Sequence, residues 1–164
     1  MGEGNEKRQA EQRAKAQLRA ELALGEKPLL DELAAVGYGV QSVWDLVNSD
    51  TTYPGAIPVL LKYPRLSRHP ILREGIARAL TTREARGIAG GEILNQLKQR
   101  GEESPNEARW ALANALTVVA DANMVDEIES LIHDHRYAEE QNVLKLALKK
   151  WLPSDLSPTD CDIS

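Results

Sequence analysis

An internal repeat is the feature of this 164-residue chain that most restricts its fold. The segment REGIARALT begins at Arg73, and its near copy RWALANALT begins at Arg109, 36 residues later. A further shift of 32 residues carries Leu112 onto Leu144. A unit this short cannot bury its own apolar face, so neighbouring units have to stack and share a core. The repeat therefore predicts an array of similar, stacked units.

Composition and spacing indicate that each unit is a pair of helices. The chain holds 20 Ala and 22 Leu but no Phe, and Ala and Leu lose little side-chain freedom in a helix. Apolar residues recur at helical spacing, and Pro and Gly fall mostly between these segments. Four pairs are expected, over residues 28–48, 54–80, 81–119 and 125–152. The predicted class is all-α.

Three parts are expected along the chain. Residues 1–27 form a charged N-terminal helix, which Gly25 closes. This helix is either solvated or a docking helix for a partner or a second copy. Residues 28–152 hold the repeats, and Pro28 begins their first helix. Residues 153–164 form an acidic tail with little to bury, which we expect to be disordered.

Local signals predict one irregular helix, in the third pair. Thr81 or Thr82 is expected to be its N-cap, and the helix is expected to run towards Lys98. Gly90 and Gly91 lie inside this segment. Because glycine weakens a helix interior, a distortion is expected there.

The repeated segments, with Ala77 and Ala79 matching Ala113 and Ala115, resemble the HEAT family of helical repeats. The resemblance includes the bacterial HEAT-like variety first noted in phycobilin lyases, and it covers residues 28–150. It implies a right-handed α-α superhelix, a short HEAT-like solenoid of about four helical hairpins. In that family the second helices line a concave surface that typically binds proteins and less often nucleic acid. HEAT-like DNA glycosylases and the bilin lyases are members that act as enzymes.

Charge is divided unevenly along the chain. Residues 53–90 carry seven basic and two acidic side chains, whereas residues 101–164 carry five basic and 13 acidic ones. Such asymmetry indicates an oriented field and a charged partner. Four side chains on the second helices are expected to bind an acidic protein surface, facing away from the apolar residues: Arg73, Arg78, Arg109 and Lys145. The alternative for the arginines is that they pair with nearby carboxylates or cap the interfaces between repeats.

The expected function is that of a non-catalytic scaffold that binds a protein through its concave helix row. The alternative is a HEAT-like nucleic-acid-binding protein or an enzyme, similar to a DNA glycosylase or a bilin lyase. A pI of about 5.3 does not favour nucleic-acid binding. The sequence holds no phosphate loop, dinucleotide fingerprint or nucleophile elbow. No cofactor is expected.

The reactive side chains are not arranged for chemistry. His133 and His135 would point about 200° apart on a helix, and a surface turn is expected there. Cys161, the one cysteine, allows neither an internal disulfide nor a cysteine cluster for zinc. Trp44 and Trp110 are expected in the core. Without a secretory signal or an apolar stretch of roughly 18 residues, a cytoplasmic location away from membranes is expected.

Overall fold

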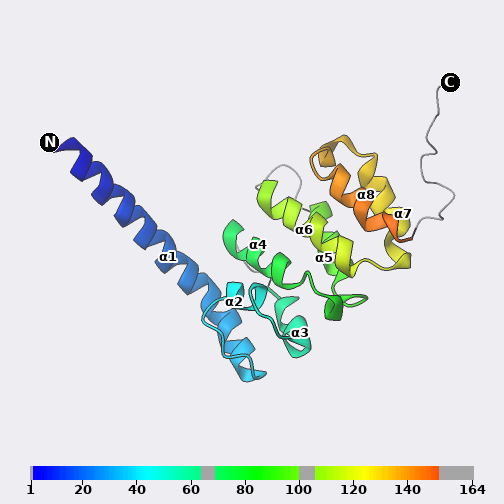
Figure 1. Ribbon diagram of the computed structural model, residues 1–164, viewed down its shortest axis with the longest axis horizontal. Coiled ribbons are helices and arrows are strands. Elements are labelled where there is room, and N and C mark those ends of the chain that lie inside the picture. Colours follow the sequence, from blue (N-terminus) through cyan, green and yellow to red (C-terminus); the bar gives the residue numbers. More distant parts are fainter. Residues whose placement is uncertain (1, 64–68, 100–105, 152–164) are drawn as a thin grey trace.

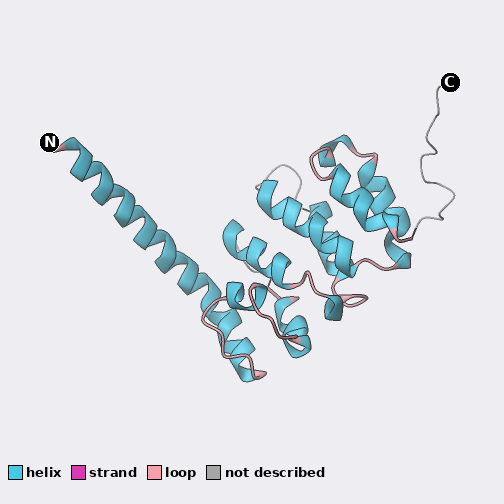
Figure 2. Ribbon diagram, in the orientation of Figure 1, coloured by secondary structure: helices cyan, strands magenta, loops and turns pink. Residues whose placement is uncertain are grey.

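The computed structural model describes residues 2–63, 69–99 and 106–151. Over these residues the chain forms α-helices joined by turns and short 3-10 segments, without a strand (Figure 2). The all-α prediction is confirmed. The eight α-helices of the described residues are α1 (Glu3–Ala35), α2 (Val43–Val47), α3 (Ile57–Leu60), α4 (Pro70–Ala79), α5 (Gly90–Gln99), α6 (Asn106–Val119), α7 (Val125–Ile132) and α8 (Gln141–Lys149).

The second helices of the pairs pack side by side in chain order (Figure 1). α2 contacts α4, α4 contacts α6 and α6 contacts α8, while α5 and α7 each pack on the helix that follows them. Leu80, Leu116 and Leu148 occupy equivalent positions of the repeat, and each is at most 3% exposed. Ala77 and Ala113 are buried as well, at 2% and 0% exposure. The repeat therefore predicted these core positions correctly.

The longest helix, α1, differs from the prediction. It runs through Gly25 and Pro28, so the predicted helix end at Gly25 and helix start at Pro28 are both wrong. The expected boundary between the first two parts of the chain falls inside α1. Burial outweighs the low helix propensity of glycine and proline, since Leu29 and Leu33 are completely buried. The expected tail over 153–164 lies outside the described residues.

Polar contacts also hold the C-terminal part of α1 against the residues that follow α3. The Tyr63 hydroxyl donates to Glu32 Oε1 at 2.6 Å, and Lys62 Nζ lies 2.9 Å from Glu32 Oε2. Burial and then the bond to Glu32 raise the pKa of Tyr63 to about 12. The end of α1 is therefore fixed by both apolar and polar contacts.

The first helix of the third pair begins later than predicted. Thr82 precedes a short 3-10 segment, Arg83–Ala85. Gly87 then takes a φ of +75°, a left-handed conformation that suits glycine and stops the chain from continuing as a helix. α5 starts at Gly90. The predicted helix is therefore interrupted, as expected, but the interruption lies at residues 86–89, just before Gly90 and Gly91, which open α5.

These two adjacent glycines are expected to respond oppositely to alanine. A Cβ on Gly90 would lie 2.7 Å from Met124 Sδ and 3.1 Å from the Val119 carbonyl oxygen. The end of the Met124 side chain can move, but the Val119 carbonyl oxygen belongs to the backbone, so Gly90→Ala is expected to lower the free energy of unfolding by about 1 kcal/mol. A Cβ on Gly91 meets nothing within 4 Å, so Gly91→Ala should raise it by roughly 0.5–1 kcal/mol. Urea denaturation measures both, and shifts of the same sign would contradict the close approach at Gly90.

Candidate interaction surface

A buried ion pair between Arg109 and Glu140 joins α6 to α8. Arg109 Nη2 donates to Glu140 Oε2 at 2.9 Å and to the Arg136 carbonyl oxygen at 2.5 Å. The guanidinium also lies over the Tyr137 ring, 5.4 Å from its centre. The Arg109 side chain is 12% exposed and that of Glu140 only 1%. The contacts of Arg109 are therefore internal to the fold, and it does not stand on an open face.

Arg73 occupies the same place as Arg109 one repeat earlier, and it is also partly buried. The residue that corresponds to Glu140 is Ala108, so Arg73 lacks the carboxylate that Arg109 has. Arg73 Nε is buried without a hydrogen-bond partner among the described residues, and burial lowers the pKa of the guanidinium. Both arginines are therefore partly buried at equivalent positions of the repeat, and the direction in which they face stays a prediction.

The other two side chains predicted to bind a partner reach solvent. Arg78 Nη2 lies 2.9 Å from Glu74 Oε1, one turn earlier on α4, and the Arg78 side chain is 39% exposed. Lys145 is exposed on α8. The four predicted cations therefore differ in exposure, since Arg109 is more buried than Arg78 and Lys145. The part that each plays in binding a partner stays a prediction.

Two large apolar side chains are exposed, although the sequence analysis did not identify them as surface groups. Trp110 on α6 is 43% exposed, so the expectation that it lies in the core is wrong, and Leu146 on α8 is 58% exposed. The repeat matches Trp110 with Glu74 and Leu146 with Asn114, which are polar positions on neighbouring helices. That match was the signal that could have identified both. Trp44 packs against the core as predicted.

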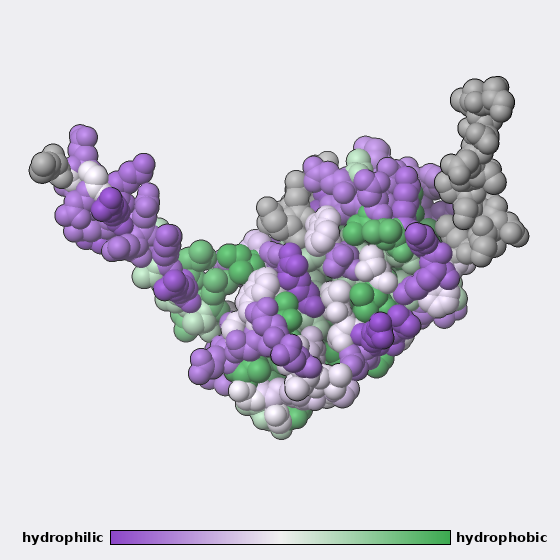
Figure 3. Space-filling view, in the orientation of Figure 1, coloured by the Kyte–Doolittle hydropathy of each residue, from purple (hydrophilic) through white to green (hydrophobic). Residues whose placement is uncertain are grey.

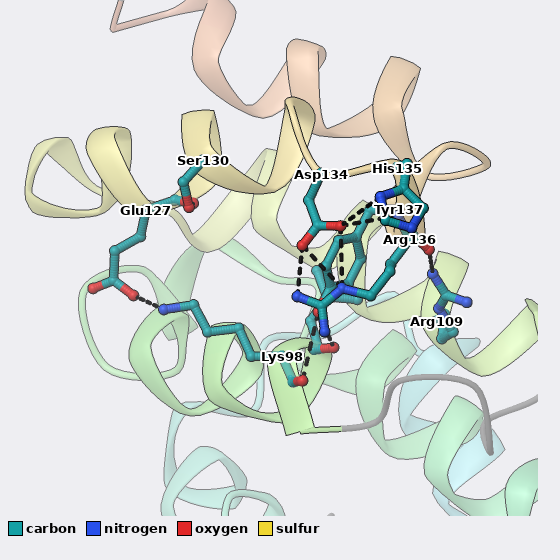
Figure 4. A network of polar contacts seen from close by, with 9 residues as sticks. Lys98, Arg109, Glu127, Ser130, Asp134, His135, Arg136 and Tyr137 are labelled. Atoms are coloured by element: carbon teal, nitrogen blue, oxygen red, sulfur yellow. Dashed lines mark hydrogen bonds and ion pairs between the residues drawn. The ribbon is translucent and has the colours of Figure 1, made fainter.

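The chain between α7 and α8 forms the turn predicted around the two histidines. Both His133 and His135 are exposed there. Asp134 accepts hydrogen bonds from the Arg136 side chain, and Tyr137 turns inward beneath them (Figure 4). No group of three or more His, Cys, Asp or Glu side chains within the described ranges is placed to hold a metal ion. Polar contacts hold this turn against α6, through Arg109, and against α5, where the Tyr137 hydroxyl donates to the Leu97 carbonyl oxygen at 3.3 Å.

The hydrogen bonds that Asp134 accepts are expected to make the stability of the protein depend on pH, because they are lost in acid. Hydrogen bonds from the side chain and the backbone N–H of Arg136 lower the pKa of Asp134 from 3.8 to about 2. These bonds therefore stabilise the folded state fully above pH 3.8, and that stabilisation is lost as the pH falls through about 2. Thermal unfolding between these pH values should show a smaller fall in melting temperature for Asp134→Asn than for the wild type. Parallel pH profiles would contradict this role.

Four described side chains stand out as groups that a partner could contact. Trp110 and Leu146 are apolar and exposed, and Arg78 and Lys145 carry positive charge at the surface.

None of the helices that the structure describes has both the length and the apolar character needed to cross a bilayer. No protein-family model, curated protein or solved structure matches this chain.

Proposed function

We propose that the protein is a non-catalytic helical scaffold that binds a partner protein through one face of α6 and α8. This α6–α8 face consists of Trp110, Asn114, Lys145 and Leu146. The observation that carries the proposal is the exposure of Trp110 (43%) and Leu146 (58%) on helices that pack side by side. Neighbouring exposed apolar groups are typical of protein contacts, and tryptophan is enriched among the residues that dominate binding energy.

The charges beside this face favour a partner with an acidic surface. Lys145 precedes Leu146 directly, and Lys149 follows it by three residues; both lysines are exposed. Arg78 adds a further charge on α4, although it is shared with Glu74. A partner that offers apolar groups to Trp110 and carboxylates to the lysines fits this arrangement. The ionic part of the binding should weaken as salt concentration rises.

The scaffold that we propose is a HEAT-like, right-handed α-α superhelix of about four hairpins. The ordered packing of α2, α4, α6 and α8 supports it. The small side chains Ala77 and Ala113, buried at equivalent positions, also support it because they let neighbouring helices approach closely. In such a superhelix the second helices line the concave side, which would include the α6–α8 face.

Affinity capture from a lysate of the source cells tests the proposed function. The baits are the wild type, Trp110→Ala/Leu146→Ser, and the control Ile88→Ser. Ile88 is 60% exposed in the turn before α5, so the control removes a comparable apolar group elsewhere. We expect Ile88→Ser to retain a protein that the wild type captures, and the double variant to lose it by about tenfold or more.

Two results would contradict the proposed function. One is equal capture by all three baits, which would show that the α6–α8 face is not used. The other is release of the captured material by nuclease, which would favour the nucleic-acid-binding alternative. Far-ultraviolet circular dichroism of each bait shows whether its helices are intact.

A further inference from the structure

A cleft of about 200 Å³ opens between α1, the start of α2 and the first turn of α4. Its walls include Leu22 on α1, Trp44 on α2, and Ile71 and Leu72 on α4. Ile71 is 37% exposed, and Leu22 and Trp44 are partly exposed. Figure 3 shows apolar residues gathered where α1 leaves the body of the molecule, beside the start of α4. The cleft is therefore an apolar site that is open to solvent.

The N-terminal half of α1 extends beyond this cleft and away from the other helices (Figure 1). Every residue from Gly2 to Glu21 is exposed. A helix without packing contacts is only marginally stable in water, even when its residues are good helix formers. This half of α1 therefore lacks the tertiary contacts that stabilise most helices, and a bound partner would supply them.

Helical spacing shows which side chains of the protruding half lie on the same face of α1 as the residues that line the cleft. Arg19 and Leu22 line the cleft, and residues three or four apart share one face of a helix. Steps of this size back from Arg19 reach Lys15, Gln12 and Arg8. All three are exposed. Arg8, Lys15 and Arg19 therefore form a basic stripe that leads into the apolar cleft.

We propose that the cleft and the basic stripe bind an acidic amphipathic helix of a partner protein. Its apolar side chains would enter between Leu22, Trp44 and Ile71, and its carboxylates would face the basic stripe. This site is separate from the α6–α8 face, so the proposal goes beyond the proposed function and does not depend on it. Binding would cover both the apolar cleft and the unpacked half of α1.

Charge and polarity together select this occupant. Residues 7–19 carry five basic side chains and one acidic one, so they attract carboxylates and repel the same segment of a second copy. A nucleic acid would satisfy the stripe but would leave Trp44 and Ile71 uncovered, and its phosphates would approach Glu26 in the cleft wall. A helix with carboxylates on one side and apolar groups on the other satisfies both parts of the site.

Fluorescence anisotropy with a labelled peptide tests the proposal on the full chain. The probe is an amphipathic peptide of about 18 residues, or five helical turns, with leucines on one face and glutamates on the other. The reference peptide has lysine in place of each glutamate. We expect the glutamate peptide to bind at least about tenfold more tightly than the reference, and to bind more weakly as salt is added.

Matched pairs of variants locate the binding site. Leu22→Ser and Lys15→Glu/Arg19→Glu alter the cleft and the stripe, and each should weaken binding of the glutamate peptide by about tenfold or more. Leu24→Ser is the control for the first, because Leu24 is 76% exposed on the same helix and does not line the cleft. Lys7→Glu/Arg13→Glu is the control for the second, because it reverses two charges outside the stripe. Both controls should bind like the wild type.

Several results would overturn the proposal. No binding of the glutamate peptide, or equal binding of both peptides, would show that the site does not select acidic helices. Equal losses for Leu22→Ser and Leu24→Ser would place binding outside the cleft. An oligonucleotide that displaces the peptide would assign the stripe to nucleic acid. A wild-type dimer in light scattering that Leu22→Ser converts to a monomer would assign the cleft to a second copy.

The variant Trp110→Ala/Leu146→Ser should still bind the peptide. Failure of the proposed function is therefore distinguishable from failure of the cleft to bind the peptide.

Discussion

Replacing Glu140 with alanine is expected to lower the free energy of unfolding by about 3–5 kcal/mol. The Glu140 side chain is 1% exposed, and it pairs with Arg109, whose side chain is 12% exposed. Removing the carboxylate would leave a positive charge buried between α6 and α8. The hydrogen bond from Arg109 to the Arg136 carbonyl would compensate only in part. Chemical denaturation followed by circular dichroism measures the loss.

A double-mutant cycle separates the ion pair from its surroundings. Arg109 Nε and Glu140 Oε1 are both buried without hydrogen-bond partners in the part of the chain that the structure describes, so the pair does not recover its full desolvation cost. We therefore expect Arg109→Leu/Glu140→Leu to destabilise less than the two single leucine variants combined, with a coupling of roughly 1–3 kcal/mol. The control Glu139→Ala changes an exposed neighbour and should stay within about 0.5 kcal/mol of the wild type. Losses that simply add would argue against direct coupling.

This ion pair also shows how far the repeat could predict the structure. The repeat correctly gives Arg73 and Arg109 equivalent positions, but comparing units reveals only what they share. Glu140 stands where the earlier unit has Ala108, so the carboxylate that draws Arg109 inward is specific to one interface. Trp110 is the opposite case, because its residue type suggested the core whereas its repeat position did not. Position in the repeat was the better guide to exposure.

Local signals were least reliable where distant contacts hold a helix together. Gly25 and Pro28 disfavour a helix interior by about 1 and 3 kcal/mol, and they predicted an end at that point. The contacts that keep α1 continuous come from residues well beyond them in sequence. Ser42 and Val43 bond to Glu26, and Leu29 and Leu33 are buried in the core. A prediction of α1 from its own residues could not include these hydrogen bonds and apolar contacts from later parts of the chain.

Replacing Glu26 with alanine is expected to lower the free energy of unfolding by about 2–3 kcal/mol. Glu26 is 9% exposed, and its Oε1 accepts hydrogen bonds from Ser42 Oγ at 3.0 Å and from the Val43 N–H at 2.5 Å. One carboxylate therefore both caps the start of α2 and ties α2 to α1. Thermal and chemical unfolding measure the loss. The control Glu21→Ala changes an exposed carboxylate on the same helix and should cost less than about 0.5 kcal/mol.

The same two variants show whether geometry or charge governs the cleft beside α1. Both remove one negative charge near the basic stripe, which on charge alone should strengthen binding of the glutamate peptide. Only Glu26→Ala also releases the α1 wall of the cleft from the α2 wall that carries Trp44. We therefore expect Glu26→Ala to weaken peptide binding, whereas Glu21→Ala leaves it unchanged or slightly stronger. If both variants bind more tightly by the same factor, charge alone governs binding, and a fixed distance between α1 and α2 is not required.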